Sequence, residues 1–297
     1  MSAAPLSAAT FAAPLLAAIL LLSGASVPAA AQGLPGLGGG PNPVEVNADQ
    51  AIEWHQDVRA YVARGNASAK RNDSTVFADV LTAYYREVPG KGNEVFQLLA
   101  EGNVRIVSPT QEVFGERGVY DVDKQVAVVT GRNLKMVTRT DIVTARDTLE
   151  YYEAKNLTVA RGDAVAVRIA NGDRLRADIL IGQLKKMPDG STQMERIDGA
   201  GSVVVTTATD VALSDKLVYS VADETAVLLG NVKITRNDNQ LNGEAAEMNM
   251  RTKVNRVIAG PATGGRVMGL LVPGQEPGAP GAASASAQPG AKPAPKP

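Results

Sequence analysis

Cysteine is absent from this chain of 297 residues. The protein therefore has no disulfide, no thiolate metal site, no cysteine nucleophile and no lipid-modified cysteine. If it is exported, packing and strand pairing must stabilise it. Histidine is nearly absent too, because His55 is the single one, and a metal site with several histidine ligands is excluded. Nothing marks a serine and an acid as partners of His55, so the sequence predicts no catalytic triad and no enzyme.

An excess of charge of one sign is also missing, and aromatic side chains are few. The formal net charge is −1 at pH 7, so the chain lacks the basic field that nucleic-acid binding needs. Aromatic residues make up 4% of the chain, and Trp54 is the only tryptophan. A carbohydrate-active β-solenoid enzyme needs clustered acids beside aromatic platforms, and one tryptophan supports it poorly. We expect no metal and no cofactor.

The N-terminal apolar run, residues 11–22, is shorter than the about 20 residues that a membrane-spanning helix needs. Ala29-Ala30-Ala31 before Gln32 fits a small-residue cleavage site. We therefore expect a signal peptide over residues 1–31, cleaved near Ala31. An uncleaved anchor is the alternative, because no lysine or arginine precedes the run.

Two further segments are rich in residues that do not build a core. Residues 32–43 form a Gly/Pro linker, and residues 273–297 form a tail of proline, alanine, glycine and serine. Both are predicted to be disordered, because they cannot bury enough apolar surface. The folded part is then residues 44–272, which is long enough for one all-β domain.

A short glycine phrase recurs along the folded part at intervals of 29 to 39 residues. Its glycines are Gly65, Gly102, Gly131, Gly162, Gly201, Gly230 and Gly260. A recurrence of this kind marks one supersecondary unit that is used repeatedly. Stacked units build a long surface, which favours binding over chemistry at one point.

An acidic residue follows each of the first six glycines after 14 or 16 residues. These acids are Asp79, Glu116, Asp147, Asp178, Asp215 and Glu244. Even spacing keeps side chains on one face of a strand, so the unit reads as two strands joined by a polar turn. Because the acids recur at one place in each unit, we assign them a role at strand starts and not general acid–base work.

Counting by twos from these acids and glycines predicts one apolar strand face. It contains Leu81, Val104, Ile106, Tyr120, Val122, Leu149, Tyr151, Leu217, Tyr219 and Met248. The pattern allows an ordinary sandwich core. It also allows an open trough or a lipid cavity, because the small side chains that are common here fill space poorly.

The order of these units resembles one known family. Residues 102–106 read G-N-V-R-I and residues 230–234 read G-N-V-K-I, and each is followed by a strand with a small residue and an acid. The stretches 43–50 and 265–273 are similar to the first and last strands of the LptA/OstA family, the periplasmic lipopolysaccharide-transport proteins. The similarity covers roughly residues 43–273.

The resemblance implies a periplasmic protein with an open, twisted β-jellyroll whose groove holds lipid A acyl chains. Val44 and Val46 match groove positions at the N-terminal edge, and Tyr120 and Val122 match positions on the central hairpin. Such proteins stack end to end and bridge an inner-membrane LptC-like subunit to an outer-membrane LptD-like translocon. This chain contains more units than the short family members, with the additional ones around residues 131–200.

An open sheet exposes unpaired backbone at its first and last strands, and such edges pair with other chains. We expect Val46 at one edge, and Val267, Met268 and Leu270 at the other, to contact the LptC-like and LptD-like partners or a second copy. The leading hypothesis is a non-enzymatic lipopolysaccharide carrier. The alternatives are a structural envelope bridge without cargo, and an anchored bridge subunit of the same transport system.

Overall fold

The structure is a computed structural model that describes residues 44–272 except 91, 189–191, 250–251, 253 and 261–264. The predicted signal peptide, the 32–43 linker and the 273–297 tail lie outside the described residues. The described part forms one 18-stranded sheet with antiparallel pairing, so the all-β prediction is confirmed. In this part, no helix has the length and the hydropathy to cross a bilayer.

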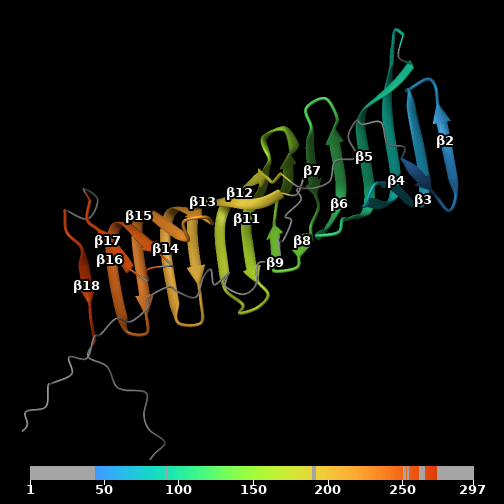
Figure 1. Cartoon of the computed structure of the whole chain (residues 1–297). Helices are drawn as coiled ribbons and strands as arrows, with labels where there is room; N and C mark the ends of the chain where they lie inside the picture. Colours follow the sequence, from blue (N-terminus) through green and yellow to red (C-terminus); the bar gives the residue numbers. More distant parts are fainter. Residues whose placement is uncertain are drawn as a thin grey trace, which may run out of the picture.

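The strands follow one another along an elongated, twisted ribbon that runs from β2 at one end to β18 at the other (Figure 1). Their bounds are β1 (Glu45–Asn47), β2 (Ala51–His55), β3 (Ala60–Arg71), β4 (Ser74–Val88), β5 (Gly92–Val107), β6 (Gln111–Asp121), β7 (Val126–Thr130), β8 (Leu134–Thr138), β9 (Asp141–Ala145), β10 (Thr148–Tyr152), β11 (Leu157–Arg168), β12 (Arg174–Lys186), β13 (Thr192–Thr206), β14 (Asp210–Ser220), β15 (Thr225–Arg236), β16 (Asn239–Asn249), β17 (Val254–Ile258) and β18 (Met268–Leu270). A 3₁₀ turn, η1 (Glu153–Lys155), follows β10.

Each long strand crosses from one layer of the fold to the other. β4, for example, pairs with β5 on both sides of a register shift that lies between Phe77 and Val80. The shift recurs in the following hairpins and folds the sheet into two facing layers. Layer A contains β2, β7, β10, β17 and the adjoining halves of the long strands, and layer B contains β1, β8, β9, β18 and the other halves.

The recurring glycines produce these bends. Gly102 has φ 76° and Asn103 has φ 46°, a pair of left-handed residues that few sequences accept. A Cβ on Gly102 would overlap the carboxylate of Asp79 on the neighbouring strand. Asn103 Nδ2 donates to Asp79 Oδ2 at 2.9 Å, so the bend is also held by a hydrogen bond.

The acids therefore lie at mid-strand bends and not at strand starts, which corrects their predicted role. Each one packs against the next glycine along the chain: Asp79 on Gly102, Glu116 on Gly131, Asp147 on Gly162, Asp178 on Gly201, Asp215 on Gly230 and Glu244 on Gly260. The even spacing from a glycine to the following acid is the length of one hairpin. The contact, however, joins each acid to the glycine that follows it in the chain, which lies on the next strand. This contact can be recognised only once the pairing of the strands is known.

The core lies between the two layers, along continuous cross-strand rows. One layer A row contains both large and small residues: Ile52, Ala63, Leu81, Ala100, Gly118, Val129, Leu149, Ala160, Leu180, Gly199, Leu217, Leu228, Ala246 and Val257. A layer B row faces it: Val46, Ala69, Val76, Ile106, Val113, Met136, Val143, Ala166, Leu175, Val205, Ala212, Ile234 and Leu241.

The same arrangement of strands occurs twice. β1 and β2 are one strand split at its bend and lead into β3–β6, and β9 and β10 are split in the same way and lead into β11–β14. We call β1–β8 the first half and β9–β16 the second half. Equivalent positions in the two halves are found by counting along the rows from each split strand. By this count, Leu81 is equivalent to Leu180, and Gly118 is equivalent to Leu217.

Candidate functional site

A cavity of about 580 Å³ lies between the layers in the first half. Its walls are mainly apolar, and both layers contribute. Layer A supplies Ala63, Leu81, Leu98, Ala100, Gly118, Tyr120 and Val129, and layer B supplies Val46, Ala69, Val76 and Ile106. Concave, mostly apolar spaces with a few polar groups are typical ligand sites.

Few polar side chains of the described residues face this cavity, and Arg71 at the end of β3 is the basic one among them. Arg71 is only 8% exposed. On layer A, the Tyr120 hydroxyl donates to Glu153 Oε2 at 2.9 Å. Burial raises the pKa of Tyr120, the Glu153 bond raises it further, and the positive charge of Arg71 acts in the opposite direction. Arg71 therefore acts electrostatically on Tyr120 across the interior.

The cavity is open at the N-terminal edge of the sheet. Val44, Val46 and Ile52 line it, yet each is 39–59% exposed. Trp54 lies beside them, where its Nε1 donates to the Tyr85 hydroxyl at 2.7 Å. The ring of Tyr61 stacks on that of Trp54 with a centroid distance of 5.9 Å. The entrance is thus apolar and aromatic.

In the second half, side chains fill the same space. Leu217 occupies the position of Gly118, Leu228 that of Val129, and Leu175 that of Val76. Leu217 and Leu228 are buried in the large hydrophobic cluster that extends through this half. One pair of layers therefore encloses a cavity at one end and a packed core at the other.

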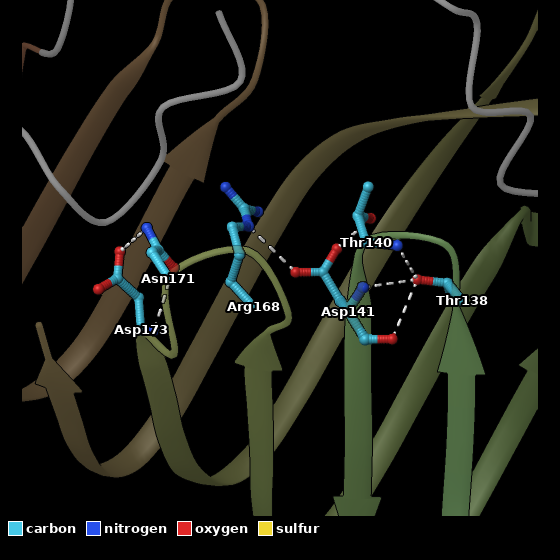
Figure 2. Close-up of polar contacts among 6 residues, drawn as sticks. All are labelled: Thr138, Thr140, Asp141, Arg168, Asn171 and Asp173. Atoms are coloured by element: carbon cyan, nitrogen blue, oxygen red, sulfur yellow. Dashed lines mark hydrogen bonds and ion pairs between the residues drawn. The ribbon is translucent and has the colours of Figure 1, made fainter. Parts of the chain in front are cut away.

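A polar row lies on the inner face of layer B, two positions beyond the apolar row. Its buried members are Arg71, Ser74, Ser108, Gln111, Asp173, Thr207 and Asp210. In the second half this row is internally paired: Arg168 Nε donates to Asp141 Oδ1 at 3.2 Å (Figure 2), and Arg236 Nη2 donates to Asp210 Oδ2 at 2.8 Å. Burial raises the pKa of Asp173 in the same row, against a hydrogen bond from Asn171.

Arg71 and Arg168 are equivalent members of this polar row. Arg71 is the last residue of β3, which pairs with β1, and Arg168 is the last residue of β11, which pairs with β9. The positive charge of each arginine opposes the rise in the pKa of an equivalent tyrosine, Tyr120 for Arg71 and Tyr219 for Arg168. The residue across from Arg168 is Asp141. The equivalent position on the first split strand is Val44, one residue before β1.

The structure brings half of the predicted groove residues to the cavity: Val44, Val46, Leu81, Ile106, Tyr120 and Val122. Val104 is buried at a bend, and the other five are buried in the core cluster: Leu149, Tyr151, Leu217, Tyr219 and Met248. Whether any of them contacts lipid stays a prediction. Arg71, which lines the cavity, was not predicted because residues 70–73 read K-R-N-D, which is typical of a turn. It lies two residues after Ala69 on the same strand face.

The predicted assembly residues lie at the sheet edges. Val267, Met268 and Leu270 are exposed next to or within β18, which pairs with β16. Val46 lies in β1, which pairs with β3. Their role in assembly stays a prediction. Among the described residues, no three acidic, histidine or cysteine side chains gather as metal ligands would.

A protein-family model described as the LptA/(LptD N-terminal domain) LPS transport protein matches this chain twice, over residues 45–155 and 143–254. The two matches overlap over residues 143–155, which contain the end of β9 and all of β10, near the start of the second half. A solved structure of LptH from Pseudomonas aeruginosa is described as the LptA homologous periplasmic component of the lipopolysaccharide transport device. It is 16% identical, with a TM-score of 0.38, and the alignment covers 45% of this chain and 95% of LptH. No curated protein matches.

Proposed function

This chain belongs to the LptA and LptD N-terminal family of LPS transport proteins, and we propose that it is a periplasmic bridge that carries lipopolysaccharide. The lipid A acyl chains lie in the cavity of the first half. The observation that carries this proposal is the apolar space of about 580 Å³ between the layers, open at the N-terminal edge. The family is one of transport proteins, so the activity we propose is carriage and not catalysis.

The cavity suits an acyl chain on energetic grounds. Each methylene that leaves water contributes about 0.8 kcal/mol, and the small alanine and glycine residues of layer A leave room for acyl chains to lie along the sheet. Tyr120 offers a ring that packs on alkyl groups and a hydroxyl that stays hydrogen-bonded to Glu153. No covalent step is needed, because transfer follows from relative affinity along the route.

Photo-crosslinking in cells tests the cargo. A photoreactive residue at Tyr120 faces the cavity, whereas one at Asp147 lies on an exposed bend. We expect lipopolysaccharide adducts at Tyr120 and none at Asp147. Equal adducts at both positions, or none at Tyr120 in a protein that still partitions to the periplasm, would contradict carriage in the cavity.

We further propose that the chain contacts an LptC-like subunit of the inner membrane and an LptD-like translocon by strand addition at its edges. A proline removes a backbone donor, so strand addition tolerates side-chain changes but not proline. Val46→Pro and Met268→Pro should each lower capture in a pull-down with the matching partner, while Val46→Thr and Met268→Leu should not. If both proline variants are still β-rich by circular dichroism and bind like the parent, edge pairing is wrong.

The two experiments also separate the alternatives. Partner capture without any lipopolysaccharide adduct would favour the structural bridge without cargo. Recovery of the chain in the membrane fraction, with residues 1–31 still attached by mass spectrometry, would favour the anchored bridge subunit.

A further inference from the structure

We propose that the outer face of layer B binds the peptidoglycan of the cell wall. This face lies on the other side of layer B from the lipid cavity, so its role goes beyond lipid carriage. Only the choice of partner rests on the proposed function, because a periplasmic bridge comes within reach of the wall. The proposal comes from comparing the charges on the two outer faces of the sheet.

The outer face of layer B consists of two rows of side chains. Successive side chains of a strand point to opposite faces, so the residues between those of the inner layer B row point outward. The first row is Ser68, Phe77, Arg105, Phe114, Lys135, Thr144, Val165, Arg176, Val204, Leu213, Lys233, Asn242 and Met268. The second row is Glu45, Lys70, Thr75, Val107, Glu112, Val137, Ile142, Val167, Arg174, Thr206, Val211, Thr235, Gln240 and Leu270.

This face is basic. Its two rows contain the acids Glu45 and Glu112 and six basic residues: Lys70, Arg105, Lys135, Arg174, Arg176 and Lys233. Arg105 is paired with Glu112 at 3.2 Å, and Arg176 is paired with Asp163 of the neighbouring bend. Among the described residues, no carboxylate is within ion-pair distance of the other four basic side chains. Most of the positive charge of this face is therefore not neutralised by the chain itself.

The outer face of layer A is balanced by comparison. Its two corresponding rows contain five basic residues, Arg64, Arg117, Arg161, Lys216 and Arg256, and five acidic residues, Glu53, Glu101, Glu150, Asp198 and Glu247. Arg64 is paired with Glu53, Arg117 with Glu101 and Arg161 with Glu150. The excess of positive charge is therefore a property of one face and not of the sheet as a whole.

Apolar side chains lie between the cations of layer B. Phe77, Val211 and Leu213 are 37–40% exposed. The Arg105 guanidinium lies 5.7 Å from the centroid of the Phe77 ring, and Lys135 Nζ lies 4.7 Å from that of Phe114. Rings at these distances attract the cations and hold them over the face. The face thus offers positive charge and apolar contact side by side.

A partner that complements this face must be acidic and must come from outside the chain. Residues 1–43 contain no charged residue, and residues 273–297 contain Glu276, Lys292 and Lys296, so neither segment supplies an excess of negative charge. A second copy offers the balanced outer face of layer A or the same basic face. Neither of these attracts the outer face of layer B.

The spacing of the cations and the twist of the sheet favour a polymer as the partner. The first-row cations lie on β5, β8, β12 and β15, which are two or three strands apart, or about 10–15 Å. The ribbon twists along its length (Figure 1), so a flat bilayer would touch only a short part of the face. A polymer with separate carboxylates can follow the twist from one cation to the next.

Peptidoglycan has this chemistry. Its glycan strands carry short peptides with free carboxylates, which suit the separate cations, and with alanine methyl groups, which suit the valine and phenylalanine side chains between them. A bridge between the two membranes must pass the cell wall with its long faces exposed to it. We therefore expect the outer face of layer B to bind the wall while the interior carries lipid.

Co-sedimentation of the full mature chain with purified peptidoglycan tests the proposal. The parent chain should sediment with the wall at low salt and be released at about 1 M salt, where the Debye length is about 3 Å. Lys135→Glu with Lys233→Glu should weaken binding roughly fivefold or more, because both cations of the face become anions. Arg117→Glu with Lys216→Glu is the matched control. It changes the net charge equally on the outer face of layer A and should stay within about twofold of the parent.

Circular dichroism establishes that both double variants are folded. If either is not, Lys135→Gln with Lys233→Gln decides in its place, against Arg117→Gln with Lys216→Gln. A parent chain that does not sediment, equal losses for the two double variants, or binding that survives high salt would overturn the proposal. Binding to phosphatidylglycerol vesicles but not to peptidoglycan would assign the face to a bilayer and overturn it too.

The outcome can be separated from that of the proposed function. Lipopolysaccharide adducts at Tyr120 in a chain that does not bind peptidoglycan would overturn the wall contact and leave lipid carriage standing. Peptidoglycan binding through this face without adducts at Tyr120 would overturn lipid carriage and leave the wall contact standing.

Discussion

The two halves of this molecule share a fold but differ in what lies between their layers. In the first half, the layers enclose a cavity of about 580 Å³ that is open at the edge of the sheet. In the second half, the equivalent rows close into a continuous core that includes Leu180, Leu217 and Leu228. The bends, the hairpins and the register are alike, so the backbone does not decide between cavity and core.

The comparison shows that a few side chains make the difference. Glycine at position 118 and leucine at position 217 have equivalent pairing partners, and they set the volume between the layers. Valine at position 44 and aspartate at position 141 lie at equivalent places on the two split strands. The repeated units therefore differ in their interior and are alike at their bends.

Matched truncations should separate the two interiors most strongly. Leu180→Ala removes a side chain from the packed core, and we expect it to lower the free energy of unfolding by about 2–5 kcal/mol. Leu81→Ala is the same change at the equivalent position, where the side chain borders an existing cavity and loses less contact. It should cost less than half as much in urea denaturation. Equal losses would mean that the first half is as tightly packed as the second.

Substitutions at the bends should lower stability equally in both halves, and by less than the truncation of Leu180. Gly102→Ala and Gly201→Ala each place a Cβ at positive φ and against an acid, Asp79 or Asp178. Each should cost about 1–3 kcal/mol of stability. Adding Asp79→Ala to Gly102→Ala removes the overlap, so the double variant should lose less than the sum of the singles. Additive losses would show that the acid does not crowd the glycine.

We expect the smallest difference in stability between the halves for an ion pair that occurs in both of them. Glu150 and Arg161 repeat the pair Glu53 and Arg64, but the Glu150 side chain is 8% exposed and that of Glu53 is 37% exposed. Burial alone would raise the pKa of Glu150, but hydrogen bonds from Thr148, Arg161 and Tyr152 hold it below its ordinary value.

The ionised form of Glu150 is therefore favoured in the folded chain. Its contribution to stability is present above the unfolded pKa of about 4.3 and is lost as the pH falls through the lower folded value. Glu150→Gln should lower stability at pH 7 by about 1 kcal/mol and flatten the loss of stability below pH 4, when melting is followed against pH. Glu53→Gln should change both the stability at pH 7 and its loss below pH 4 by a smaller amount. A larger effect at Glu53 would contradict the expectation that the less exposed ion pair contributes more.

The sequence predicted the all-β fold, the repeated hairpins and the family, and the family match confirms that resemblance. These follow from local pattern, since glycine phrases and period-two alternation are visible in one dimension. The contact of each acid with the next glycine was not predicted, because it depends on strand pairing. The apolar face was predicted, but its division into a cavity and a core depends on what the opposite layer places across from each residue, as at Gly118 and Leu217.

Hydrogen–deuterium exchange of the full mature chain, with and without bound lipopolysaccharide, tests the difference between the halves most directly. It follows both halves in one sample and needs no substitution. The account predicts slower exchange on lipid binding in the layer A segments of β3–β7 and little change in the equivalent segments of β11–β15. Equal slowing in both halves, or slowing confined to β11–β15, would contradict a lipid site that belongs to the first half.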